Sequence, residues 1–291
     1  MSHTRFSVSQ DREALRQLWQ LVFEDSDTFL DHFFQEHYDP QHALVLEEEG
    51  AVRAMAFWFE TQLMVPGVQP VKAAYLYAVA THPDFRGKGF ARQLLDESAQ
   101  LLHDLGCELM TLVPSEPTLH LFYQDRGFHE CFVNAEYEMT PAKPPFQLPG
   151  ISLEQVDPQT YTDVREQLLY GTPRLNYSQA AMAYQEGCCK LSGGGLYVGR
   201  TPAGPVCLTL ERSPENMMLA KELLGSHDAL MFMNGEFYKL APNLRWSVRC
   251  PVGFATPDAS VKKFGMLRWL DPVVAENWDY ESTAYLGLAF D

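Results

Sequence analysis

The chain lacks an apolar segment long enough to cross a membrane. None of the apolar runs in its 291 residues reaches the roughly 18 residues that a membrane-spanning helix needs. The first ten residues, MSHTRFSVSQ, also lack the apolar core of a secretory signal. The sequence therefore predicts a cytoplasmic protein with no membrane partner.

Positive charge is scarce as well. The chain carries 22 Lys and Arg residues against 38 Asp and Glu residues, which gives a formal net charge of −16 and an isoelectric point near 4.9. Because binding to a nucleic-acid backbone requires a basic face, this balance argues against nucleic acid as a partner. It is compatible with a cationic substrate such as an amine.

Metal-ligand patterns are also missing. The six cysteines show no C-x-x-C spacing and no ligand-like pairing with histidine, so the sequence predicts no metal cofactor. The simplest interpretation is that these thiols are reduced and mostly buried in a cytoplasmic protein.

What the chain does contain is a strand-turn-helix segment from Tyr75 to Ala91, YLYAVATHPDFRGKGFA. Tyr75 to Ala80 is a short apolar run typical of a strand, and His82 to Phe85 is typical of a turn. Arg86 to Ala91 is expected to open a helix, with Gly106 as its C-terminal cap.

Such a segment makes an anion site. The first N–H groups of a helix have no partner within it, and the helix dipole adds positive potential there. Gly87 and Gly89 let a ligand approach the backbone, while Arg86 and Lys88 add charge. The segment lacks the Gly-Lys-Ser/Thr ending of a P-loop and the third glycine of a dinucleotide fingerprint. The expected ligand group is a phosphate or pyrophosphate.

Two motifs carry a family resemblance. The spacing Arg86-x-x-Gly89-x-Ala91 after an apolar strand resembles the acetyl-CoA signature of the GNAT superfamily of N-acyltransferases. About forty residues on, Leu121 to Phe128, LFYQDRGF, is similar to that superfamily's second signature, an aromatic-Tyr pair followed by Gly-Phe. The resemblance covers roughly residues 3 to 139 and implies a mixed twisted sheet with helices on both faces.

The resemblance implies acetyl-CoA as co-substrate and suggests where it binds. The pantetheine arm is expected along the backbone of Val79, Ala80 and Thr81. Backbone N–H groups of this strand could also stabilise the oxyanion if the strand splays at a bulge. The pyrophosphate is expected on the loop residues Arg86, Gly87, Lys88, Gly89, Phe90 and Ala91.

Acetyl transfer to an amine also needs a general acid and a general base. By the resemblance, Tyr123, four residues before Gly127, is the acid, because a phenol stays protonated at neutral pH. The alternative is a tyrosine that only packs in the core. The base stays open between Glu60, His82 and the terminal carboxylate of Asp291. Glu60 is the first candidate because it ends an apolar strand expected beside the central one; a solvated strand-end charge is its alternative.

Prolines suggest the domain organisation. Residues 140–150, TPAKPPFQLPG, contain four prolines and a glycine and are expected to form a stiff linker. The linker would separate a GNAT catalytic domain at 1–139 from a smaller α/β domain at 151–291. The expected fold class is mixed α/β (α+β). The second half loosely repeats the element order of the first without either signature. It is interpreted as a degenerate GNAT-like unit that could form one wall of the acceptor pocket.

The two-part plan, with the stretch Phe264 to Leu270 near its end, resembles bacterial acetyltransferases related to the enhanced-intracellular-survival family.

Ala43 to Glu48 and Ala51 to Phe59 are expected to form a β-hairpin, and Thr61 to Val71 a loop or irregular strand pair. Ser115 is expected to cap a short helix. Residues 217–224 are compatible with either strand or helix.

Two functions are compatible with the sequence. The first is an acetyl-CoA-dependent N-acyltransferase that moves an acetyl group to a primary amine by direct attack in a ternary complex. The second is a non-catalytic CoA-binding sensor or interaction module. The unassigned base, the degenerate second half and Glu116, which stands where the superfamily often has Asn, motivate the second. A small-molecule or peptide amine, the acyl length and the oligomeric state stay open.

Overall fold

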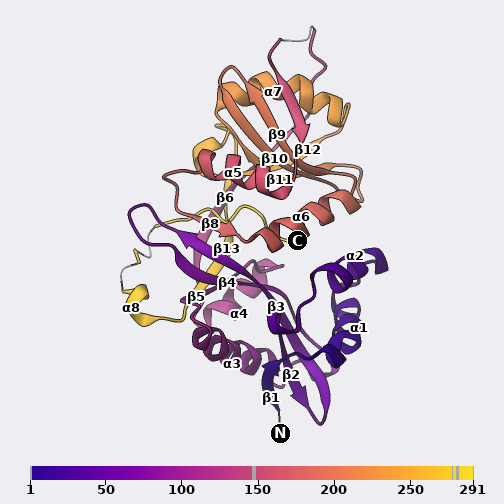
Figure 1. The fold of residues 1–291 in the computed structure, drawn as a ribbon, viewed down its shortest axis with the longest axis vertical. Helices are drawn as coiled ribbons and strands as arrows, with labels where there is room; N and C mark the ends of the chain where they lie inside the picture. Colours follow the sequence, from indigo (N-terminus) through magenta and orange to yellow (C-terminus); the bar gives the residue numbers. More distant parts are fainter. Residues whose placement is uncertain (1, 146–148, 277, 280–281, 291) are drawn as a thin grey trace. The chain divides into compact units, whose positions relative to one another are not determined.

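The computed structural model describes residues 2–145, 149–276, 278–279 and 282–290 (Figure 1). The chain divides into two compact units. Unit 1 contains residues 1–131, 176–181 and 265–282, and unit 2 contains residues 132–175, 182–264 and 283–291. Neither unit is one continuous stretch of chain. The segment 140–150, expected as a linker, falls within unit 2, and its residues 146–148 lie outside the described residues.

Unit 1 is built on a mixed sheet with the strand order β1-β2-β3-β4-β5-β13. Neighbouring strands are antiparallel except β4 and β5, which run parallel. The strands are β1 (His3–Phe6), β2 (Ala43–Glu48), β3 (Ala51–Met64), β4 (Val71–Thr81), β5 (Leu109–Leu112) and the C-terminal part of β13 (Ser260–Trp269). The short strand β8 (Arg174–Tyr177) pairs with β3.

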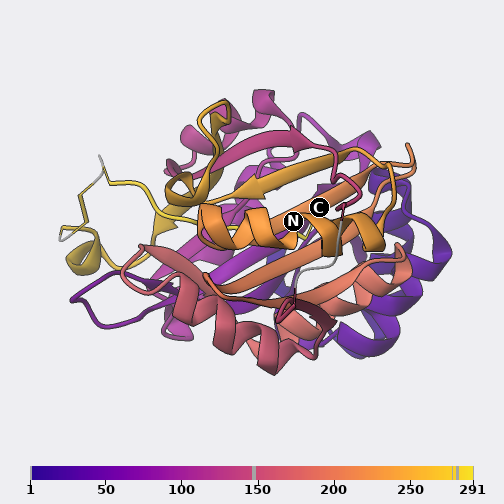
Figure 2. The same ribbon diagram turned by 90° about the horizontal axis from the view of Figure 1, so that it is seen from above.

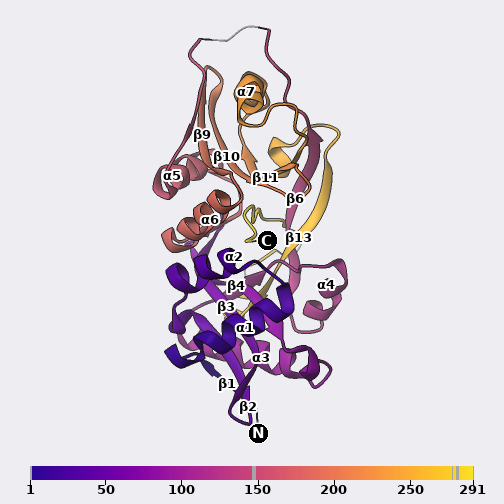
Figure 3. The same ribbon diagram turned by 90° about the vertical axis from the view of Figure 1, so that its right-hand side faces the viewer.

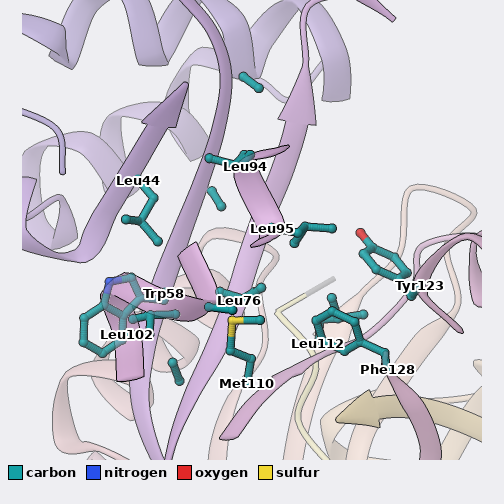
Figure 4. Packing of buried hydrophobic residues seen from close by; sticks show 14 of the residues in the cluster. Leu44, Trp58, Leu76, Leu94, Leu95, Leu102, Met110, Leu112, Tyr123 and Phe128 are labelled. Atoms are coloured by element: carbon teal, nitrogen blue, oxygen red, sulfur yellow. The ribbon is translucent and has the colours of Figure 1, made fainter. Parts of the chain in front are cut away.

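Helices cover both faces of this sheet (Figure 1). On one face, Trp19 and Phe33 pack against the strands, with ring centroids 5.3 Å from Trp19 to Tyr77 and 4.8 Å from Phe33 to Phe57. On the other face, leucines of α3 join residues of the strands in one buried cluster, which also includes Tyr123 (Figure 4). The elements are α1 (Arg12–Phe23), α2 (Asp27–His32), the π-turn η2 (Phe33–His37), α3 (Phe90–Asp104), α4 (Pro117–Gln124) and α8 (Pro272–Ala275), with 3-10 turns η1 (Ser9–Asp11), η3 (Pro40–His42) and η4 (Pro83–Phe85).

The hairpin of β2 and β3 is confirmed, but the expected loop between Thr61 and Val71 is wrong. β3 continues to Met64, and Leu63 pairs with Val71 at the start of β4. The cause is visible in the burial pattern, because Thr61 and Leu63 are buried while Gln62 is exposed, so the two-residue alternation of β3 runs on. The cap expected from Ser115 is also wrong, since Glu116 occupies the N-cap of α4, ahead of Pro117.

Unit 2 has the strand order β6-β12-β11-β10-β9-β7, and here β11 and β12 are the parallel pair. Helices α5 and α6 lie on one side of β9 and β10, and α7 lies on the other and crosses the strands (Figures 2 and 3). The bounds are β6 (His129–Met139), β7 (Ser152–Gln155), β9 (Gly195–Thr201), β10 (Gly204–Arg212), β11 (Met218–Leu224), β12 (Trp246–Cys250), α5 (Pro158–Leu168), α6 (Gln179–Leu191), α7 (His227–Leu240) and the turn η5 (Val252–Phe254).

Unit 2 therefore repeats the strand order and strand directions of unit 1. Strands are counted from β1 in unit 1 and from β7 in unit 2. In both units, the third and fourth strands run antiparallel, and the fourth and fifth run parallel. The mixed α/β fold class is confirmed, and the repeat supports the interpretation of the second half as a GNAT-like unit. Residues 217–224, left open between strand and helix, form β11.

Helix α7 had no counterpart in the sequence-based expectations. Its interior contains Gly235, which is unfavourable in a helix by about 1 kcal/mol relative to Ala. A Cβ at that position would lie 2.9 Å from Cγ of Pro144, so close packing accounts for the glycine. The signal that could have revealed the helix is Ser226, whose side chain accepts a hydrogen bond from the Ala229 N–H at the N-cap.

A buried polar network lies between α5 and the strands of unit 2. The Arg165 guanidinium donates to Glu222 at 2.9 Å, and the Tyr161 hydroxyl donates to the same carboxylate at 2.8 Å. Arg165 is 2% exposed and Glu222 is fully buried. Burial and the Glu222 charge hold the pKa of Tyr161 well above its usual value, so its hydroxyl stays a donor. Breaking this network would leave an uncompensated charge buried inside the unit.

We expect Glu222→Ala to lower the free energy of unfolding by about 3–5 kcal/mol, because it removes the fully buried carboxylate that pairs with the buried Arg165 charge. Urea denaturation followed by circular dichroism measures this loss. The matched control is Asp27→Ala, which breaks the pair of Arg16 with a carboxylate that is 73% exposed and should change stability by less than about 1 kcal/mol. Similar losses in the two variants would contradict the role of burial.

Candidate active site

The central strand β4 carries a bulge. Its register with β3 shifts between Met55 and Phe57, so that Ala78 and Val79 both lie opposite Ala56. Ala78 has a φ of +48°, a left-handed conformation that costs an alanine about 1–2 kcal/mol. A bulge takes backbone groups of the extra residue out of the ladder, and such strain is common at functional sites.

The ladder on the other side of β4 ends early. The last pair between β4 and β5 joins Tyr75 to Thr111, and β5 stops at Leu112, whereas β4 continues to Thr81. Beyond that pair, the edge of β4 that faces β5 presents backbone groups to which an extended ligand can hydrogen-bond as an added strand. The residues predicted to contact pantetheine, Val79 to Thr81, lie on this edge.

The loop after β4 leads to the N-terminus of α3. The helix begins at Phe90 and not at Arg86, so the expectation that Arg86 opens it is wrong: Arg86, Gly87 and Lys88 form an exposed loop. Gly87 and Gly89 have φ values of +76° and +83°, and added Cβ atoms would meet nothing within 4 Å. Glycine is therefore needed here for the backbone conformation.

The first turn of α3 has no side-chain cap. Gly89 is the N-cap residue, and the first helical hydrogen bond runs from the Gln93 N–H to the Gly89 carbonyl at 2.9 Å. The N–H groups of Phe90, Ala91 and Arg92 precede that bond, so they are the groups of the helix that can bind an anion.

Two cations flank the ring of Phe85 at this loop. The Lys88 ammonium and the Arg53 guanidinium both lie 4.2 Å from the ring centroid. The Phe85 ring also stacks on Phe90, with centroids 6.0 Å apart, which links the loop to α3. Sequence reasoning missed Arg53. The predicted β3 pairing could have suggested it, since the Arg53 carbonyl accepts a hydrogen bond from the His82 N–H.

Unit 2 has no such loop at the corresponding place. Only Gly225 and Ser226 separate β11 from α7, and the Ser226 side chain caps the helix itself. The register between β10 and β11 also shifts, and the side chains at that irregularity are committed to ion pairs: Lys221 lies 3.2 Å from Glu211, and Glu222 binds Arg165. The glycine loop and the uncapped helix start of unit 1 are therefore not repeated between β11 and α7.

Tyr123 lies on α4, buried with 7% of its surface exposed. Its ring packs edge-on against Phe128, 5.5 Å between centroids, and its cluster includes Leu76 of β4 and Phe90 of α3, with Val79 packed against it (Figure 4). Burial raises the pKa of Tyr123 to about 12, although the Arg126 charge acts in the opposite direction. The structure thus brings the predicted acid into the cluster that supports β4 and α3.

The structure does not bring the candidates for the general base into the buried cluster that contains Tyr123. Glu60 is exposed and lies within β3, not at its end, opposite Ala74. Ala74 precedes the bulged Ala78 by four residues, about 13 Å along an extended strand. Burial raises the pKa of Cys107; the Glu60 and Glu108 charges add to this effect, and the Lys72 charge opposes it.

The other two candidates have different outcomes. The His82 ring Nδ1 accepts a hydrogen bond from the Asp84 N–H at 3.3 Å, so this side chain caps the turn η4. Asp291 lies outside the described residues.

A bulged, parallel-paired strand thus leads through a glycine loop into a helix whose first turn has no side-chain cap, which is the arrangement expected from the resemblance to the GNAT superfamily. Residues 3–131 match the family model of the acetyltransferase (GNAT) domain. The similarity to this family thus covers the part of the chain that contains β4 and α3. A search of the curated proteins found no match. No helix within the described part of the chain is long and apolar enough to cross a membrane.

Solved structures share the fold along both units. A GCN5-related N-acetyltransferase from Kribbella flavida is 15% identical with a TM-score of 0.71, covering 94% of this chain and 72% of its own. One from Anabaena variabilis is 16% identical with a TM-score of 0.72, covering 93% and 73%. Eis1 from Mycobacterium abscessus is 17% identical with a TM-score of 0.69, covering 94% and 75%. These similarities establish the fold of the chain.

We expect Gly89→Ala to lower the free energy of unfolding by about 1–2 kcal/mol, because an added Cβ is strained at positive φ even where space is open. Thermal and urea denaturation test this. The control is Gly253→Ala, at a position that is equally open but has no positive φ, where the change should be neutral or slightly stabilising. If both variants were neutral, the left-handed loop conformation would be wrong.

Proposed function

We propose that the protein is an acetyl-CoA-dependent N-acyltransferase that moves an acetyl group to a primary amine by direct attack in a ternary complex. The observation that carries the proposal is the bulged edge of β4 leading directly to the uncapped N-terminus of α3. An extended arm and a pyrophosphate are the two parts of CoA that these features suit. The GNAT domain over residues 3–131 supports the same activity.

In this proposal the backbone of Val79, Ala80 and Thr81 pairs with the pantetheine arm. The pyrophosphate binds the loop from Arg86 to Ala91, where the helix N–H groups and the Lys88 and Arg53 charges all favour an anion. Because these contacts use backbone donors and a short-range positive field, they tolerate wide variation of side chains elsewhere.

The chemical step places the thioester carbonyl at the bulge. The amine nitrogen attacks the carbonyl carbon, N–H donors at Val79 and Ala80 stabilise the oxyanion, and the C–S bond breaks. The nitrogen loses its second proton as the amide forms, and the leaving sulfur gains one proton, so the step balances. The pKa of Tyr123, about 12, exceeds the roughly 8.5 of a thiol, so its hydroxyl donates a hydrogen bond to the developing thiolate and passes on the proton that the nitrogen releases, without a net loss of its own.

The base takes a proton from the substrate ammonium before attack. Glu60 stays the sequence-based candidate, with His82 and the terminal carboxylate of Asp291 as alternatives. An exposed carboxylate such as Glu60 can act through water, which its distance from the bulge would require. The acceptor in this proposal is a small-molecule or peptide amine.

The second candidate function is a CoA-binding module without turnover. The observation that favours it is Glu116, which lies exposed at the N-cap of α4 where the superfamily often has Asn. Its carboxylate would repel the negatively charged cofactor if it approached it. The two functions differ in turnover and not in binding.

We expect the wild-type protein to bind acetyl-CoA with micromolar affinity, about −8 kcal/mol, and an Arg86→Ala, Gly89→Glu variant to lose that binding. The variant removes a cation and sets a carboxylate where the pyrophosphate is expected. Isothermal titration calorimetry measures both. Lys239→Ala, which removes an exposed cation of unit 2, should bind as the wild type does. No binding by wild type would refute both candidate functions.

We expect release of free CoA thiol in the presence of a suitable amine, and a fall in kcat of about 10²–10⁴-fold in Tyr123→Phe with unchanged acetyl-CoA affinity. A thiol-reactive dye and a broad amine panel provide the assay, and Tyr170→Phe, at an 88% exposed position, is the control. Glu60→Gln in the same assay tests the base. Tight cofactor binding without release from any amine would favour the binding module, and full activity of Tyr123→Phe would remove its assigned role.

A further inference from the structure

A cluster of three metal-ligand side chains lies at the end of α2, outside the site described above. His32, Glu36 and His37 each offer one ligand atom, and these atoms all lie within 4.8 Å of one another. Within the described ranges of the chain, this is the one group of three such residues with that property. None of the three takes part in the proposed transfer reaction.

One edge of the cluster has the length expected between two ligands of a bound ion. The His32 Nδ1 atom and a Glu36 carboxylate oxygen lie 3.4 Å apart, and the two imidazole centroids lie 4.7 Å apart. Two ligands at the usual 2.0–2.1 Å from a tetrahedral zinc ion are separated by about 3.3–3.4 Å. The His32–Glu36 separation already fits one edge of that tetrahedron and exceeds the range of a good N–H to O hydrogen bond.

The backbone is distorted in a way that assembles the cluster. The Tyr38 N–H donates to the Phe33 carbonyl at 2.8 Å, a bond between residues five apart that defines the π-turn η2. In a regular α-helix, a residue five positions after His32 would be rotated by about 140° from it. The π-turn instead brings His37 against His32. Single π-turns are rare and occur frequently at functional sites.

The cluster is buried on one side and open on the other. His32 is 9% exposed, whereas the Glu36 side chain is 66% exposed, so solvent and ions reach the cluster from the carboxylate side. Two imidazole nitrogens, one carboxylate oxygen and an open side match the preferences of zinc.

We propose that His32, Glu36 and His37 bind one Zn²⁺ ion, with water in the fourth position. The ion would connect Glu36 and His37 of the π-turn to His32, the last residue of α2. Phe33, inside the same turn, packs on Tyr77 with centroids 6.0 Å apart, and Tyr77 directly precedes the bulged Ala78 of β4. The ion therefore stabilises the segment that covers the bulge, and it supplies no step of the transfer reaction.

The test is metal binding by the intact chain, purified without a polyhistidine tag and stripped with a chelator. Equilibrium dialysis against Zn²⁺ followed by metal analysis should give one ion per chain, and Co²⁺ should give the visible absorption of a tetrahedral site. We expect Glu36→Gln and His37→Gln to weaken binding at least about tenfold. Addition of Zn²⁺ should raise the thermal midpoint of the wild type and not that of either variant.

Matched controls are two of the other histidine–carboxylate pairs, which belong to no group of three such ligands among the described residues. His42→Gln removes a pair with Asp39 at 3.1 Å, and His120→Gln one with Glu130 at 2.9 Å; both should bind Zn²⁺ as the wild type does. Glu36 is exposed, so its variant should fold, which circular dichroism without metal checks. Wild-type binding no tighter than that of Glu36→Gln, or equal losses in the controls, would overturn the proposal and leave an ordinary ion pair.

Discussion

Hydrogen bonding along β4 is the constraint on which the rest of unit 1 depends. The strand is paired on both sides up to Tyr75. Beyond Tyr75, the side facing β3 is bulged, and on the other side β5 ends one residue after its last pair with β4. The left-handed Ala78 persists because β3 and the core on both faces fix the strand around it. The same strand then delivers the chain to the glycine loop. A backbone edge and a helix N-terminus are thus placed by one element, and Tyr123 is held in the cluster beneath them.

The two units show how little of a binding site follows from topology alone. Both have a parallel pair at the same place in the strand order and a register irregularity beside it. In unit 2 the loop between β11 and α7 is short, Ser226 caps the helix, and Glu222 forms an ion pair with Arg165. A helix N-terminus that is capped by its own serine has fewer free donors for an anion. The difference between the units lies in loop length, glycines and capping.

Much of this could be read from the sequence, because local chemistry specifies it. The glycine loop, the strand before it and the packing position of Tyr123 are fixed by short motifs and by apolar spacing. Other features depend on contacts that are distant in sequence. Ala78 carries no local sign of a bulge, which arises from its register with Ala56, and His37 approaches His32 only through the π-turn. Glu60 was misplaced at a strand end because the alternation of β3 continues past it.

The most direct test is amide hydrogen exchange with and without saturating acetyl-CoA. If the bulged strand and the helix N-terminus form the cofactor site, the N–H groups of Val79 to Thr81 and of Phe90 to Arg92 gain protection together. The corresponding segment of unit 2, from Gly225 to Ala229, should not change. Protection confined to unit 2, or no change in unit 1 when the cofactor is bound, would contradict the placement of the site on β4 and α3.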